Sequence, residues 1–88
     1  MDLSDEMLME IYYVKTSKIR NKIMKTLKRE VKIPSKISDD TKIGRNHVSK
    51  ALGELKDHGL VECINPEMRK GKLYRLTEKG KIVSRYLS

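Results

Sequence analysis

The stretch from Gly44 to Gly59 constrains the fold more than any other part of this 88-residue chain. Its apolar residues recur at intervals of three and four, so they fall on one stripe of an α-helix. They are Val48, Ala51, Leu52 and Leu55. We therefore predict a helix over residues 45–58 that packs against a core along this stripe, with Gly44 as its N-cap and Gly59 as a left-handed C-cap.

The other side of this helix carries small, cationic and amide groups. Its members are Asn46, Ser49, Lys50 and Gly53, with Arg45 and His47 on the flanks near the helix N-terminus. Such a face is suited to entering a groove of a nucleic acid. Residues 45–58 are therefore the candidate recognition helix.

The charge of the chain agrees with a polyanionic partner. Lys and Arg number 20 against 12 Asp and Glu, which gives a formal net charge of +8 and a pI of about 9.7. A strongly basic domain is typical of proteins that bind nucleic acids. A Lys-rich surface that serves only solubility is the alternative.

The composition also excludes several classes of protein. A single Cys cannot form an internal disulfide, and the sequence has neither a CxxC spacing nor a cluster of metal ligands. It has no paired carboxylates, no Gly-rich phosphate loop and no defensible Ser, His and Asp arrangement, so we expect no enzyme, metal or cofactor. No apolar run approaches the roughly 18 residues of a membrane span, and the acidic N-terminus is unlike a signal peptide. We expect a soluble cytoplasmic protein.

A chain of this length forms one domain, residues 1–88, whose core buries only about 60 to 65 % of the unfolded surface. Because pairing would add stability, we expect a homodimer. Residues 1–14 are acidic, so they should lie away from any polyanion, for example in a subunit interface. We predict a helix over residues 5–14 with Ser4 as its cap, although residues 10–14 could instead form a strand. The apolar set of this segment is Leu3, Met7, Leu8, Ile11, Tyr12 and Val14.

Residues 15–36 are basic, with Glu30 as their one acid. Apolar residues keep a helical stripe through the segment, so we predict a helix over residues 18–30 capped by Ser17. The stripe consists of Ile19, Ile23, Met24, Leu27 and Val31. Most of the cations should face solvent, and some should reach phosphates.

A short helix from Pro34 to Thr41 should follow, because proline suits the first turn of a helix. Its Ile37 should point inward. The turn 42–44, with Ile43 buried, separates it from the helix over residues 45–58. Two helices joined by a short turn that contains glycine form a helix-turn-helix.

The last third of the chain predicts a β-hairpin and one more helix. Residues 60–64 and 71–76 have the pattern of strands, and the loop from Asn65 to Gly71 begins with an Asn-Pro turn. Thr77 should cap a helix within residues 77–87, with Gly80 allowing a neighbour to pack closely. The residues expected on its inner face are Ile82, Val83, Tyr86 and Leu87. The fold class is therefore mainly α with a small β-hairpin, in the order α-α-α-α-β-β-α.

Five short motifs follow one another in this order. They are YVKTSKIR at 13–20, PSKI at 34–37, HVSKALGEL at 47–55, GLV at 59–61 and YRLTEKG at 74–80. Together they resemble the winged helix-turn-helix transcription regulators over essentially residues 15–87, most closely small archaeal regulators akin to the MarR and ArsR families. The resemblance implies an intracellular, usually homodimeric DNA-binding regulator. Its recognition helix would lie in the major groove, and its wing, residues 65–72, would touch the minor groove or the backbone.

Specific contacts can be assigned to the recognition helix. Arg45 can pair with guanine O6 and N7 or with a phosphate, and Asn46 with adenine N6 and N7. Ser49 and Lys50, one turn on, are placed for the backbone or a second base. His47 can donate to a phosphate, or be a partly buried structural residue.

Other candidates lie outside that helix. Wing residues Arg69, Lys70 and Lys72 are candidates for phosphate or minor-groove contacts, although a merely solvated loop is the alternative. Lys36 and Thr41 on the short helix could clamp the backbone. His58 most simply interacts with its own helix C-terminus, and Cys63 with the core.

Two further features bear on the functional assignment. Gly53 stands where the resembled families more often have a long polar side chain, and either close approach to DNA or simple tolerance explains it. The absence of a separate effector domain and of clustered metal ligands argues against the metal-sensing branch. The alternative function is a winged-helix protein-interaction module within transcription or replication machinery. The sequence does not disclose an effector.

Overall fold

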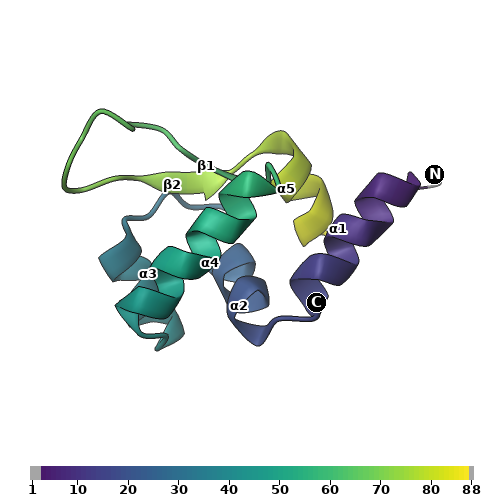
Figure 1. Ribbon diagram of the computed structural model, residues 1–88, viewed down its shortest axis with the longest axis horizontal. Helices are drawn as coiled ribbons and strands as arrows, with labels where there is room; N and C mark the ends of the chain where they lie inside the picture. Colours follow the sequence, from purple (N-terminus) through teal and green to yellow (C-terminus); the bar gives the residue numbers. More distant parts are fainter. Residues whose placement is uncertain (1–2, 88) are drawn as a thin grey trace.

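A computed structural model describes residues 3–87 of the chain, and it has the predicted order of elements (Figure 1). The elements are α1 Asp5–Lys15, α2 Lys18–Thr26, α3 Pro34–Thr41, α4 Arg45–Asp57, β1 Val61–Cys63, β2 Tyr74–Leu76 and α5 Glu78–Ser84. Helix α4 crosses the middle of the molecule, the hairpin loop extends at one end, and α1 lies at the other. The predicted fold class, mainly α with a two-stranded wing, is confirmed.

Side-chain caps fix the starts of three helices as predicted. The hydroxyl oxygens of Ser4, Ser17 and Thr77 accept hydrogen bonds from backbone amides three residues on, at 3.1, 3.2 and 3.0 Å. These bonds satisfy amides that a helix start otherwise leaves without partners. Gly44 is the N-cap of α4, and Gly59 follows that helix with a φ of 72°, the left-handed conformation expected of it.

The core is aliphatic and is organised by α4. The predicted stripe of α4 is buried, with Val48 and Leu55 at 0 % exposure and Ala51 and Leu52 at 3 %. Helix α4 packs against α2, α3 and β1. Helix α4 is therefore anchored along its whole inner side.

Helix α2 ends earlier than predicted, at Thr26 instead of residue 30. The chain then extends, and Lys32 forms an isolated β-bridge with Tyr74 on the free side of β2. The amide of Lys32 donates to the carbonyl oxygen of Tyr74 at 3.0 Å, and the reverse bond measures 2.9 Å. Because this bridge needs extended backbone, Val31 leaves the predicted stripe and is 45 % exposed.

The predicted inner face of the last helix is partly wrong, and the apolar set of α1 is divided between the core and the surface. Within α5, which ends at Ser84, Val83 is buried and Ile82 is exposed. Just beyond the helix, Leu87 is buried and Tyr86 is exposed, so only two of the four residues meet the core. In α1, Ile11 and Val14 are buried. Leu8 and Tyr12 of the same predicted set are exposed.

The hairpin is shorter than predicted, with strands of three residues each and Val61 opposite Leu76. Close packing behind it depends on Gly80, as expected. A Cβ atom at Gly80 would collide with the carbonyl oxygen of Leu60. By contrast, a Cβ atom built at Gly53 would have no neighbour within 4 Å among the described residues, apart from adjacent residues and the backbone of its own helix.

Among residues 3–87, no helix has the length and apolar character needed to cross a membrane.

Candidate nucleic-acid interface

The outer side of α4 is open along its length. Every side chain predicted for this face is exposed: Arg45, Asn46, His47, Ser49 and Lys50. Gly53 is exposed as well. Since the opposite stripe is buried, the helix cannot rotate this face inward without exposing the core. The exposure of His47 removes the alternative of a partly buried structural histidine.

The N-terminus of α4 has no side-chain cap. Gly44 has no side chain to act as a cap, and among residues 3–87 no side-chain hydrogen bond caps the start of this helix. The first backbone amides of the helix and the positive end of its dipole favour an anion at this point. Arg45 and Asn46, the two residues predicted to contact bases or a phosphate, are exposed at the same end of the helix.

A small hollow of about 170 Å³ lies between the start of α2 and α4. His47 and Lys50 line it from α4, and Ser17 lines it from the cap of α2. Arg20, which also lines it, is held in place: its Nε and one terminal nitrogen donate to the carbonyl oxygen of Tyr13 at 3.1 and 2.8 Å. Its other terminal nitrogen lies 3.3 Å from Glu54. The sequence identified Arg20 as one cation of the basic segment and as the last residue of the motif at 13–20, without these partners.

The wing is closed by Asn65. Its Oδ1 accepts from the amide of Leu73 at 2.8 Å, and its Nδ2 donates to the carbonyl oxygen of Gly71 at 3.1 Å. Arg69 and Lys70 are exposed within the loop that these bonds hold. The Asn-Pro turn was predicted, but this clamping role of Asn65 was not, because it depends on residues six and eight positions away.

Lys72 differs from its neighbours in the wing because it is half-buried. It lies next to Gly71, whose φ of 72° turns the chain back toward β2. Because Lys72 is half-buried, its side chain is less free to contact a ligand than those of Arg69 and Lys70. Its role in binding stays a prediction.

The two candidates on α3 already have partners within the protein. Lys36 Nζ lies 3.0 Å from Asp40, and the hydrogen bond and charge of Asp40 raise the pKa of Lys36. The hydroxyl of Thr41 donates to the carbonyl oxygen of Ile37 at 2.6 Å and accepts from the amide of Ile43 at 3.3 Å. Thr41 thus supports the turn between α3 and α4. Backbone contacts by either residue stay predictions.

Asp40 on α3 forms an ion pair with a buried lysine of a neighbouring segment. Its Oδ2 lies 2.6 Å from Nζ of Lys32, a residue with only 8 % exposure. The hydrogen bonds of Lys32 and then of Lys36 lower the pKa of Asp40. The carboxylate thereby attaches α3 to the segment that pairs with β2.

The prediction that His58 interacts mainly with the C-terminus of its own helix is wrong. Its Nδ1 lies 2.6 Å from Oε1 of Glu10, and its ring stacks on Tyr13 with centroids 3.8 Å apart. Lys79 contacts the other oxygen of Glu10 at 2.7 Å and donates to the carbonyl oxygen of His58 at 3.1 Å. The end of α4 is therefore attached to both α1 and α5.

Cys63 is half-buried, with Sγ 3.5 Å from Oδ1 of Asn65. It therefore lies at the base of the wing, outside the buried core. Within residues 3–87, no three His, Cys, Asp or Glu side chains gather in a way that could hold a metal ion.

Comparison with known proteins identifies the family. The family model described as "Methanogenesis regulatory protein FilR1, N-terminal domain" matches residues 8–88. A search of curated proteins gives no match. The MarR and ArsR resemblance itself stays a prediction.

Two solved structures of a doubly substituted ZitR from Lactococcus lactis share the fold. One has a TM-score of 0.71 at 25 % identity and covers 80 % of this chain and 49 % of its own. The other, in apo form, has a TM-score of 0.72 at 22 % identity and covers 90 % and 61 %. The chain thus spans about half to three-fifths of the length of these structures.

Proposed function

The chain belongs to the family of the N-terminal domain of the methanogenesis regulatory protein FilR1, and from this membership we propose that it is a DNA-binding transcription regulator. The observation that carries the proposal is the two-sided character of α4. Its inner stripe is buried in the core, while Arg45, Asn46, Ser49 and Lys50 are exposed on one outer face. A helix of this kind fits the major groove, where Arg and Asn discriminate bases.

The wing supplies a second contact. Arg69 and Lys70 are exposed in a loop whose shape Asn65 maintains. They would contact the DNA backbone or the minor groove beside the site that α4 occupies. Contacts to phosphates carry no sequence information, but they fix the position of the protein on the duplex. Specificity therefore comes from α4, and much of the affinity comes from the wing.

We propose that the regulator is a homodimer joined through α1. The exposed face of α1 is apolar, with Leu8 50 %, Met9 67 % and Tyr12 66 % exposed. Exposed apolar residues grouped on one helix are typical of interaction surfaces. The acidic residues beside them, Asp5 and Glu6, suit a location away from DNA. A Tyr12→Glu variant should sediment as a monomer at concentrations at which the parent protein sediments as a dimer.

Selection of bound duplexes from a random pool tests the function most directly. We expect an inverted repeat whose half-sites lie about one helical turn apart, because a two-fold dimer imposes its symmetry on the site. Fluorescence anisotropy on the selected duplex and on a random one, across a salt series, should show a specific and a nonspecific component. Absence of binding to either duplex at low salt would contradict the proposal.

The second candidate is a protein-interaction module, favoured by the same exposed face of α1. This function predicts a stable complex with another protein. It also predicts that the affinity for DNA does not change with salt concentration. A pull-down followed by the same salt series separates the two functions.

A further inference from the structure

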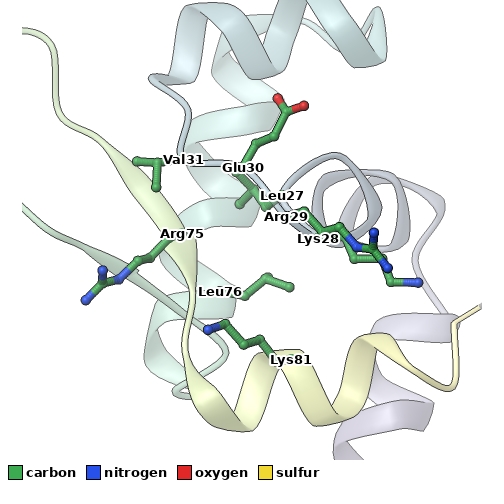
Figure 2. A pocket seen from close by; sticks show the side chains of 8 residues that line it. All are labelled: Leu27, Lys28, Arg29, Glu30, Val31, Arg75, Leu76 and Lys81. Carbon is green, nitrogen blue, oxygen red and sulfur yellow. The ribbon is translucent and has the colours of Figure 1, made fainter.

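A hollow of about 460 Å³ opens between the segment after α2, strand β2 and helix α5 (Figure 2). Small-molecule sites commonly measure about 300 to 1,000 Å³, so the volume suits a small ligand. Lys28 and Arg29 of the basic segment 15–36 line it, but the candidate residues of α4, of α3 and of the wing loop do not. The hollow therefore lies apart from the outer face of α4 and from the wing tip.

The floor of the hollow is apolar. Leu27 and Leu76 form it, with exposures of 1 and 2 %. Val31 forms part of the wall and is 45 % exposed, although the sequence placed it in the core. Residues 3–87 therefore leave almost half of Val31 open to solvent. A ligand with an apolar body would remove Val31 from water and contact the two leucines.

The rim of the hollow is cationic. Lys28 and Arg29 line one side, and neither forms an ion pair within the described part of the chain. Lys81 lies below the floor in Figure 2, with its amine directed toward β2. Its one ion pair in residues 3–87 is with Glu78 at 3.4 Å, and the Glu78 side chain is 91 % exposed. Such a pair between exposed groups contributes little, so Lys81 can pair with a ligand instead.

The other two charged residues of the hollow are engaged elsewhere. The guanidinium of Arg75 points outward in Figure 2 and lies 2.8 Å from Glu62. The carboxylate of Glu30 points away from the floor and lies 3.5 Å from Nζ of Lys32. The uncompensated charge at the rim is therefore positive.

We propose that this hollow binds a small amphipathic anion, a molecule that joins an apolar body to one carboxylate or similar group. The apolar body covers Val31 and lies on Leu27 and Leu76. The anionic group pairs with Arg29 and Lys81, whose long, flexible side chains would swing toward it from different sides of the hollow.

The hollow lies beside the β-bridge that connects the segment after α2 to strand β2. Val31 directly precedes Lys32, and Arg75 directly follows Tyr74, the two residues joined by backbone hydrogen bonds of 3.0 and 2.9 Å. A ligand in the hollow therefore touches both segments that meet at this bridge. The backbone amides of Lys32 and Tyr74 should respond to binding.

Nuclear magnetic resonance of the isotope-labelled protein, without DNA, tests the proposal independently of the proposed function. Octanoate serves as the probe, with octanol as the uncharged control and acetate as the control without an apolar body. We expect octanoate to give saturable shifts at residues 27–32 and 74–76. We expect acetate and octanol to cause at most small, unsaturated shifts there. Shifts by octanoate that spread over all cationic surfaces, or equal shifts by octanol, would overturn the proposal.

Paired variants locate the anionic contact. The double variant Arg29→Gln and Lys81→Gln should bind octanoate about tenfold more weakly, since it loses charge-assisted contacts. The matched control, Lys50→Gln with Arg69→Gln, loses the same charge from the DNA face and should bind octanoate like the parent. Equal affinity of the two double variants would also refute the assignment. All four side chains are exposed, so both variants should fold.

Discussion

Nδ1 of His58 lies 2.6 Å from Oε1 of Glu10, a contact that joins the C-cap of α4 to the middle of α1 across 48 residues of sequence. Lys79 from α5 contacts the other carboxylate oxygen at 2.7 Å. Glu10 is only 8 % exposed, so its charge depends on these partners. The proposed dimer helix is thus attached to the end of the proposed recognition helix through one carboxylate.

The stability of the domain should fall as pH is lowered through the folded pKa of Glu10. Burial alone would raise the pKa of Glu10, but the hydrogen bonds and charges of Lys79 and His58 outweigh burial and hold it below 4.5. A depressed carboxyl pKa gives stability that is complete above the unfolded pKa and is lost as pH falls through the folded value. Urea unfolding at a series of acidic pH values measures this loss.

The variant Glu10→Gln provides the control for this pH dependence. It should unfold more easily at neutral pH by about 1 to 2 kcal/mol, because its partners lose a charged acceptor. It should also lose less stability on acidification than the parent. Glu67→Gln, an exposed wing residue, should behave like the parent. An unchanged acid response in Glu10→Gln would assign the acid sensitivity to other groups.

Substitutions in α4 should change sequence preference. Arg45→Ala and Asn46→Ala each remove one base contact, at a cost of about 1 to 3 kcal/mol of discrimination. Affinity for duplexes that vary one base pair at a time measures the effect, and each variant should become indifferent at one position of each half-site. Equal loss of affinity for every duplex would reassign the residue to phosphate contact.

Substitution in the wing should act on all sequences alike. Lys70→Ala should weaken every duplex to a similar degree and reduce the slope of log affinity against log salt by about 1, since one phosphate contact is lost. Lys81→Ala removes the same charge outside the proposed interface and should leave the slope unchanged. The idea fails if both variants change the slope equally.

Two glycine substitutions should have opposite effects on stability. Gly80→Ala should destabilise the domain by about 1 to 3 kcal/mol, because its Cβ collides with the backbone of Leu60. Gly53→Ala meets open space and should stabilise α4 by about 0.5 to 1 kcal/mol. Thermal or urea unfolding compares the two. Loss of DNA affinity in the stabilised Gly53→Ala variant would show that the helix backbone approaches the duplex closely.

Local patterns predicted most of the fold. The stripe of α4, the hydroxyl caps at Ser17 and Thr77, and the left-handed Gly59 depend on residues within one or two turns of the chain, so periodicity and cap chemistry identify them. The exposed face of α4 followed from the same periodicity. Which of its side chains touch DNA stays a prediction.

Long-range pairings could not be predicted in this way. The bridge between Lys32 and Tyr74, which ends α2 early, depends on two segments far apart in sequence. The same holds for the partners of His58, so its local interpretation as a helix-end charge was wrong. The inner face of α5 also depended on its neighbours, because Ile82 and Val83 are equally apolar and adjacent in sequence.

The bridge between Lys32 and Tyr74 has a mechanical consequence. Lys32 lies two residues before the start of α3, and Tyr74 is the first residue of β2, the strand that returns from the wing. The bridge therefore fixes α3 and the wing, the two elements that flank α4, relative to each other. The span between them is set by the protein alone. A duplex held at both points must adapt its own curvature or groove width to that span, and stiff and pliable sequences would then differ in affinity even where no side chain touches a base.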